Sequence, residues 1–256
     1  SAEVALREYK DKKVYSLGPL IHNQTALEEL EKKGLNILDE NQIDKTDSDC
    51  VVIIRAHGVS LGIKEKLNAR KVVLIDSTCP RVTVSQNRVA EFSEKGYTII
   101  LAGDKGHAEV EGIKGCAKGD VYCIEDLKEA ETVFSKTFDK KSLLLCQTTF
   151  SSIEFEKISE YLKQKIPQLE IINTICPATK KLCMTVDGII VVGGKKSANT
   201  IRLYQKAASF VKNAVHIEKP SEIPDFFKNL ETVGVTAGAS TPDNVIEEVI
   251  RALYCN

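Results

Sequence analysis

Short runs of aliphatic and β-branched residues alternate along this chain with longer amphipathic stretches. The runs end at Gly, Ser, Thr, His or Cys, which is typical of buried strands that lead into turns. We predict strands at residues 13–17, 51–54, 72–75, 97–101, 142–146, 171–172, 188–192 and 232–236. The stretches between them favour helices at residues 1–9, 25–33 and 82–95. Further helices are expected to begin after residue 60, to end at about residue 165, and to close the chain. This alternation predicts βα units around parallel sheets, and therefore an α/β fold.

Two cysteines occupy equivalent places in this pattern. Cys79 and Cys176 each follow an apolar run and directly precede a proline. Proline suits the first turn of a helix, because its missing N–H would have no partner there in any case. Each thiol is therefore expected at a turn from strand to helix. The positive end of the following helix favours the thiolate, which is the form that binds metals.

The composition narrows the class of protein. The chain has 256 residues, 43% of them hydrophobic and 28% charged, with a net charge of −1. A charge so close to zero argues against binding to nucleic acids or membrane surfaces by bulk electrostatics, and no apolar run has the length of a membrane span. Eight cysteines in 256 residues are not the density of a disulfide scaffold. With no signal-peptide pattern at the start, we expect a cytoplasmic protein with free thiols or metal ligands.

The polar residues that follow the predicted strands form a repeat. Three of the loops carry polar residues that we call polar tips of the first kind. Each is followed, at a comparable separation along the chain, by a loop with a polar tip of a second kind. The first kind is His22 with Asn23, His107 with Glu109, and Ser197 with Asn199; the second is His57, Thr148 with Thr149, and Ser240. We therefore predict three similar α/β modules, at residues 1–79, 80–175 and 176–256. Loops at the carboxyl ends of parallel strands form ligand sites, so the three modules are expected to share one centre.

The repeat is incomplete in two places. Cys79 lies further ahead of His107 than Cys176 lies ahead of Ser197, so the third module is short in the stretch after Lys181. The first module has no cysteine ahead of His22, and by analogy one is expected before residue 1. We hypothesise that both missing pieces border one site and are disordered, trimmed or deleted.

Seven motifs in order resemble those of the 4-hydroxy-3-methylbut-2-enyl diphosphate reductase family, also called LytB/IspH. One of these motifs alone would be weak, but together they run through essentially the whole chain. They are SLGPLIHN at 16–23, RAHGVS at 55–60, DSTCP at 76–80, GHAEVEG at 106–112, QTT at 147–149, ICPAT at 175–179 and VTAGAS at 235–240.

The resemblance implies a pseudo-three-fold trefoil of three α/β domains with small parallel sheets around a central iron–sulfur cluster. It also implies a two-electron reductive dehydroxylation that gives isopentenyl and dimethylallyl diphosphate, the last step of the non-mevalonate isoprenoid pathway. Three cysteines would hold a [4Fe–4S] cluster with one open iron position. Cys79 and Cys176 match two of the three, whereas the third belongs to an N-terminal segment that this chain lacks.

The resemblance also assigns the polar tips. Glu109 would supply a proton, Thr148 would contact the substrate hydroxyl, and His107 would belong to the catalytic set. Ala198 stands where the family commonly has a second serine, so one hydroxyl donor is missing. The residues expected to bind the diphosphate substrate are His22, His57, His107, Thr148, Thr149, Ser197, Ala198, Asn199 and Ser240.

The chain has no nucleotide-binding fingerprint, so electrons are expected from a ferredoxin or flavodoxin, and a monomer is expected. Two alternatives remain open from the residues. One is a non-catalytic diphosphate-binding protein of the same fold without a cluster. The other is a thiol-redox or zinc-dependent hydrolase that uses Cys79 and Cys176, although the chain has neither a C-x-x-C nor an H-E-x-x-H motif.

Overall fold

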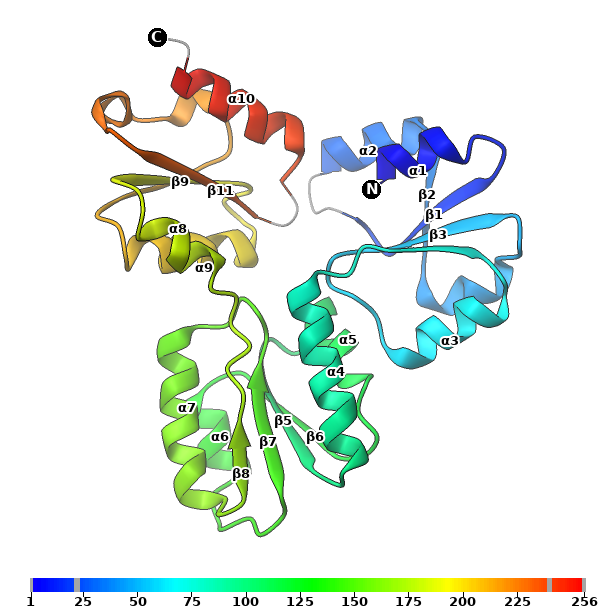
Figure 1. Cartoon of the computed structure of the whole chain (residues 1–256), viewed down its shortest axis with the longest axis vertical. Helices are drawn as coiled ribbons and strands as arrows, with labels where there is room; N and C mark the ends of the chain where they lie inside the picture. The colour runs from blue at the N-terminus through cyan, green and yellow to red at the C-terminus, as the bar shows by residue number, and fades with distance from the viewer. Residues whose placement is uncertain (1, 21–23, 239–240, 255–256) are drawn as a thin grey trace. The chain divides into compact units, whose positions relative to one another are not determined.

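The structure is a computed structural model that describes residues 2–20, 24–238 and 241–254, and it contains three parallel β-sheets flanked by helices (Figure 1). Contacts between residues divide the chain into two compact units. The first consists of Ser1–Gly18 and Lys33–Ile175, and the second of Pro19–Lys32 and Cys176–Asn256. The predicted boundary between residues 175 and 176 coincides with this division, whereas the one after residue 79 lies inside the first unit. The division into three modules stays a prediction.

The first sheet of the first unit has the strand order β2-β1-β3-β4, and all its strands are parallel. The inner strand β3 is buried along its whole length, as expected of a parallel strand covered on both faces. Ile63 and Leu67 of α3 belong to the same core cluster as Val52 and Ile54 of β3. The elements are α1 (Ala2–Glu8), β1 (Lys13–Leu17), β2 (Leu35–Leu38), the 3₁₀ helix η1 (Glu40–Lys45), β3 (Cys50–Ile54), α3 (Leu61–Ala69) and β4 (Val73–Asp76).

The second sheet of the first unit is also parallel, with the order β6-β5-β7-β8. Helices α4 and α7 lie on its two sides (Figure 1). Successive side chains of a strand point to opposite faces, so Ile99 packs in the cluster of α4 and Ile100 in that of α7. The elements are α4 (Pro80–Glu94), β5 (Thr98–Ala102), α5 (Ala108–Lys114), β6 (Val121–Ile124), α6 (Leu127–Val133), β7 (Ser142–Cys146), α7 (Ser152–Lys165) and β8 (Leu169–Ile171).

The second unit contains a three-stranded parallel sheet with the order β10-β9-β11. Its inner strand β9 divides two cores, because Ile189 and Val191 pack with α8 and α9, whereas Ile190 and Val192 pack with α10. The elements are α2 (Gln24–Lys32), α8 (Ala178–Cys183), β9 (Gly188–Val192), α9 (Ala198–Ala208), β10 (Asn213–Ile217), the 3₁₀ helices η2 (Pro220–Glu222) and η3 (Asp225–Asn229), β11 (Val233–Ala237) and α10 (Asp243–Tyr254).

All three sheets follow the same path. The chain begins on an inner strand, moves to the strand on one side, and then crosses to the strand on the other side, as in β5, β6 and β7. The loops after the first and third strands therefore leave neighbouring parallel strands at the same edge. Such a reversal of direction is the point where open parallel sheets bind ligands. The predicted polar tips that the structure describes lie in loops or helix starts that follow these strands.

The predicted α/β class with small parallel sheets is confirmed. The sequence did not predict the edge strands β2 and β6, which are only four residues long. Their apolar pattern is too short to separate from a loop, and the pairing with β1 and β5 stabilises them as strands. In the part of the chain that the structure describes, no helix combines the length and apolar character needed to cross a bilayer.

Candidate active site

The start of α5 positions two of the predicted residues. His107 caps this helix, and its Nδ1 accepts a hydrogen bond from the backbone N–H of Glu109 at 3.1 Å. An imidazole nitrogen that accepts a hydrogen bond carries no proton, so a neutral His107 holds its proton on Nε2. The histidine is half-buried. His107 can therefore donate from Nε2, which suits an anionic or hydroxyl-bearing ligand.

Glu109 is a buried carboxylate that meets Thr148. The side chain of Glu109 is 3% exposed. One of its oxygens accepts the backbone N–H of Thr148 at 2.6 Å, and the other accepts the Thr148 hydroxyl at 2.9 Å. Burial raises the pKa of Glu109 above the ordinary value of 4.5, and these two hydrogen bonds only partly oppose the shift. A buried carboxyl group with a raised pKa is suited to hold and deliver a proton.

The loop after β3 brings a second histidine to this pair. His57 and His107 form an edge-to-face contact, with ring centroids 5.2 Å apart and planes at 90°. His57 lies in the motif RAHGVS, which follows β3 of the first sheet, whereas His107 follows β5 of the second sheet. The predicted clustering of these histidines is therefore present within the first unit.

Gln147 links the loop ahead of α5 to Thr149. Its Oε1 accepts the backbone N–H of Asp104 at 3.0 Å, and its Nε2 donates to the Thr149 hydroxyl at 3.2 Å. Thr149 is half-buried beside Thr148. The sequence motif QTT drew attention to the two threonines but did not assign Gln147 a role. That role depends on a contact between loops 43 residues apart, which a single sequence cannot reveal.

Cys79 lies at the predicted turn from strand to helix. It caps the 15-residue helix α4, with Pro80 as the first helical residue. The Cys79 N–H donates to the carbonyl of Ala56 at 3.0 Å, next to His57. Three residues before the cysteine, the Asp76 carboxylate accepts the N–H of Thr78 at 3.0 Å. This turn and the bond to Ala56 fix the thiol of Cys79 near the histidine loop.

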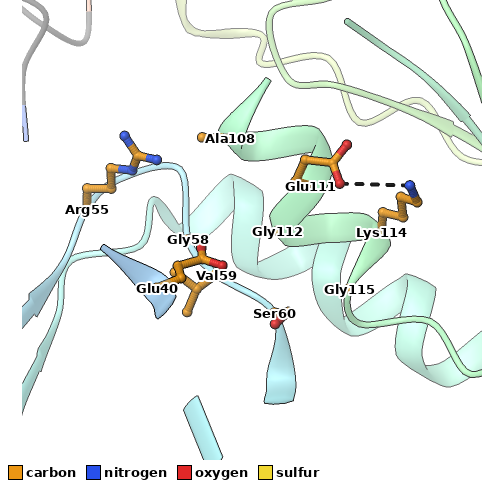
Figure 2. A pocket seen from close by; sticks show the side chains of 10 residues that line it. All are labelled: Glu40, Arg55, Gly58, Val59, Ser60, Ala108, Glu111, Gly112, Lys114 and Gly115. Atoms are coloured by element: carbon orange, nitrogen blue, oxygen red, sulfur yellow. Dashed lines mark ion pairs between the residues drawn. The ribbon is translucent and has the colours of Figure 1, made fainter. Parts of the chain in front are cut away.

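A cavity of about 370 Å³ lies between the His57 loop and α5 (Figure 2). Its wall contains both signs of charge, and Glu111 pairs with Lys114 at 3.8 Å. Burial lowers the pKa of Arg55, and Glu40 opposes this shift. The cavity is lined by Glu40, Arg55, Gly58, Val59, Ser60, Ala108, Glu111, Gly112, Lys114 and Gly115.

The second unit carries its own group of predicted residues. Ser197 caps the 11-residue helix α9, and its hydroxyl accepts the N–H of Thr200 at 3.3 Å. The side-chain oxygens of Asn199 and Thr200 are buried without a hydrogen-bond partner among the described residues. Ala198 begins α9. Buried polar atoms are usually satisfied, so the start of α9 has the character of a ligand site rather than of a packed core.

Cys176 precedes Pro177 and the short helix α8, and its carbonyl accepts the Lys206 ammonium group at 2.7 Å. The segment ahead of it repeats the turn seen before Cys79, because the Asn173 side chain accepts the N–H of Ile175 at 3.0 Å. His22 and Ser240, and Asn23 beside His22, lie outside the residues that the structure describes.

The remaining described cysteines differ from Cys79 and Cys176. The sulfurs of Cys50, Cys116, Cys123, Cys146 and Cys183 each take part in a hydrogen bond. Burial raises the pKa of all five thiols, to about 11 for Cys123 and Cys146. Cys79 and Cys176 are half-buried, and their sulfurs form no hydrogen bond with any residue that the structure describes. In that same part of the chain, no three His, Cys, Asp or Glu side chains form a metal-binding group.

Comparison with known proteins places this geometry in a family. A sequence model of the family described as LytB protein matches residues 1–254. The chain belongs to the LytB family. Relatives in this family include the 4-hydroxy-3-methylbut-2-enyl diphosphate reductase of Caldanaerobacter subterraneus subsp. tengcongensis, which is 40% identical over 256 residues, with 97% of this chain and 88% of that protein covered. The reductase of the same name from Treponema denticola is 41% identical over 252 residues, covering 94% of this chain and 87% of that protein.

A solved LytB-family structure agrees with this assignment. The structure of (E)-4-hydroxy-3-methyl-but-2-enyl diphosphate reductase, the terminal enzyme of the non-mevalonate pathway, matches with a TM-score of 0.72 and 34% identity over 99% of this chain and 92% of that one. The predicted family and its class, an enzyme of isoprenoid biosynthesis, are confirmed. The roles of individual residues, the monomeric state and the cytoplasmic location stay predictions.

Proposed function

We propose that this chain converts 4-hydroxy-3-methylbut-2-enyl diphosphate to isopentenyl and dimethylallyl diphosphate. The relatives at about 40% identity bear the name of that reductase. The reaction replaces a carbon–oxygen bond with a carbon–hydrogen bond, takes up two electrons and two protons, and releases water. The observation that carries the proposal is the buried pair of Glu109 and Thr148 beside His107. The pair is a proton source of the kind that this reaction needs.

Glu109 and Thr148 provide a path for that proton. When Glu109 is ionised, the Thr148 hydroxyl donates to its carboxylate. When Glu109 is protonated, its carboxyl group donates to the Thr148 oxygen, and the Thr148 hydroxyl donates in turn to the hydroxyl oxygen of the substrate. Transfer of the two protons along this chain protonates the substrate oxygen, which departs as water, and leaves Glu109 ionised. Because burial raises the pKa of Glu109, its carboxyl group stays protonated to a higher pH than that of an exposed glutamate.

The diphosphate is assigned to neutral donors at the ends of strands and the starts of helices. The backbone N–H groups at the start of α9 suit phosphate oxygens, and Ser197 and Asn199 lie at that start. His107 donates from Nε2, and His57 contacts its ring. Thr149 lies next to Thr148. By family resemblance, His22 and Ser240 complete this set, and Ala198 leaves its position without a hydroxyl.

Cys79 and Cys176 fit an iron–sulfur cluster of the [4Fe–4S] type as two of its three thiolate ligands. Both are half-buried, both precede a helix, and their sulfurs are not engaged by other described residues. Such a cluster, when bound, supplies electrons and an open iron position for the substrate hydroxyl. The third ligand is assigned to the N-terminal segment of the family. Electrons are assigned to a ferredoxin or flavodoxin, since the chain has no dinucleotide fingerprint.

Turnover and iron content test this proposal together. The full-length protein as encoded is purified without oxygen, analysed for iron and acid-labile sulfide, and supplied with substrate and a reduced one-electron donor. About four iron and four sulfide per chain and formation of both products support the reductase. A protein that binds the diphosphate but holds no iron after reconstitution would overturn it in favour of a non-catalytic binding protein.

A further inference from the structure

Gln86 is a buried polar residue without a role in the proposed reaction. It lies on α4, which begins directly after Cys79, and its side chain is 4% exposed. Its Nε2 donates to the carbonyl of Val59 at 3.0 Å and is 3.4 Å from the carbonyl of Gly112. A buried amide is usually retained only where its hydrogen bonds are satisfied. Here both partners are main-chain carbonyls of other elements.

The two carbonyls belong to the segments that carry the histidine pair. Val59 follows His57 by two residues in the loop after β3. Gly112 lies in α5, one turn after Glu109. Both Val59 and Gly112 also line the cavity of Figure 2. One side-chain amide on α4 therefore connects the His57 loop with the helix that carries His107 and Glu109.

Two glycines make this three-way contact possible. A Cβ atom on Gly112 would lie 3.3 Å from the Gly58 carbonyl and from the His57 oxygen, so the helix and the loop approach through their backbones. Gly58 has a φ of +70°, which side chains rarely adopt, and a Cβ there would lie 2.7 Å from Nε2 of Gln86. The missing side chain of Gly58 leaves space for the Gln86 amide, and that of Gly112 lets α5 approach the loop closely.

We propose that Gln86 is a positioning residue that sets the distance between His57 and the His107–Glu109 segment. The inference rests on the proposed function of those three residues. The amide acts through the backbone carbonyls of Val59 and Gly112 and contacts no reacting group. Removing its donors frees the loop and the helix to separate, and a misplacement of about 1 Å can lower turnover roughly 100-fold.

The variant Gln86→Met tests this proposal, because methionine keeps the length and volume of the side chain and removes both donors. The matched control is Ser85→Ala, the neighbouring buried residue, whose hydroxyl donates to the carbonyl of Arg81 within α4. In the holoenzyme, we expect kcat to fall about tenfold or more in Gln86→Met. KM should rise by a smaller factor, because His57 and His107 shift while Ser197 and Asn199 on the second unit are untouched.

Hydrogen exchange measured by mass spectrometry on the same holoenzyme gives a readout independent of turnover. Peptides covering 55–61 and 107–113 should exchange faster in Gln86→Met, while β9 and the Ser85→Ala variant stay as in the parent. Unchanged exchange in those peptides overturns the proposal, as does an unchanged kcat in an active enzyme. If the parent itself shows no turnover, the proposed function fails, and the exchange data still decide whether Gln86 joins the two segments.

A second variant keeps the test valid if methionine prevents folding. Gln86→Asn retains the amide but is one methylene shorter, so it cannot reach both carbonyls at once. We expect its kcat and exchange rates to lie between those of the parent and Gln86→Met. Parent values for both quantities in Gln86→Asn would also contradict the proposal.

Discussion

At the scale of single residues, the chemistry of this LytB-family chain centres on one buried carboxyl group. Glu109 takes up both hydrogen-bond donors of Thr148 and lies in the first turn of α5 behind the cap residue His107. Asp104 nearby opposes ionisation of Glu109 and adds to the effect of burial on its pKa. Burial and Asp104 both favour the protonated carboxyl group more than at an exposed glutamate, which suits a proton donor.

Replacing Glu109 by Gln should remove turnover while preserving substrate binding. The amide has nearly the same shape but no acidic proton, so we expect kcat to fall by about 10²–10⁴ with little change in the dissociation constant of the diphosphate. Steady-state kinetics and calorimetric titration measure the two quantities. Glu131→Gln, an exposed glutamate on α6, is the control and should match the parent. A Glu109→Gln enzyme with parental kcat would remove Glu109 from the proton path.

The same variant should show a pH-dependent gain in stability. Because the folded pKa of Glu109 is raised above 4.5, its stabilising contribution is complete below that pH and is lost as pH rises through the folded pKa. The amide of the variant does not titrate and has no such loss. The free energy of unfolding of the parent should therefore fall relative to that of Glu109→Gln as pH rises from 4.5 through the folded pKa. Urea denaturation followed by circular dichroism measures it, and a constant difference across this range contradicts the predicted pKa shift.

At the scale of elements, the site depends on how closely α5 approaches the loop after β3. The histidine contact, the Gln86 hydrogen bonds and the missing side chain of Gly112 all lie along this one approach. Helix α5 follows β5 of the second sheet, whereas the loop follows β3 of the first sheet. The spacing of His57 and His107 therefore depends on how the two sheets pack against each other. A side chain added where α5 meets the loop should change that spacing.

Gly112→Ala should lose stability or gain none, in contrast to the same change at Gly62. Alanine is the better helix former by up to about 1 kcal/mol, and nothing lies within 4 Å of a Cβ on Gly62 in α3. At Gly112 the new methyl group meets backbone atoms of Gly58 and His57 at 3.3 Å, which cannot rotate away. We expect a higher urea midpoint for Gly62→Ala only, and a lower kcat for Gly112→Ala only. Equal stabilisation by both changes would show that α5 has room to move.

At the scale of the whole molecule, one topology is used three times. In each sheet the chain reverses direction beside the inner strand, and in each the loops at that point carry polar residues such as His57, Thr148 or Ser197. The two cysteines also occupy equivalent positions, because Cys79 comes after β4 and Cys176 after β8. Each lies three residues after a side chain, Asp76 or Asn173, that accepts a backbone N–H two residues further along the chain. Repeating one topology places similar chemistry at similar positions in different parts of the chain.

Iron binding should depend on Cys79 and Cys176 and not on the other cysteines that the structure describes. Serine is a poor ligand for this cluster type, so Cys79→Ser and Cys176→Ser should each lower the iron retained by the full-length protein after anaerobic reconstitution. Cys123→Ser is the matched control, since the Cys123 thiol is half-buried, bonded to Gly103 and has its pKa raised to about 11. Iron and sulfide analysis measures the outcome. Full iron content in either of the first two variants would remove that cysteine from the proposed ligands.

The sequence by itself determined the inner strands, the helices after Ser60 and Pro80, the cysteine turns and the choice of Glu109, Thr148 and the histidines. These features depend on local pattern: buried strands need continuous apolar runs, and helix starts need caps or proline. The edge strands β2 and β6 escaped prediction because their stability comes from pairing with β1 and β5.

Only the tertiary structure decided which polar groups meet. The two hydrogen bonds of Glu109 come from a residue 39 positions away. Those of Gln86 reach a loop 27 positions before it and helix α5 26 positions after it. The pKa of Glu109 depends on burial, which is set by all the elements packed around it. Local sequence specifies which groups are available, whereas distance, solvent exclusion and charge are properties of the folded chain.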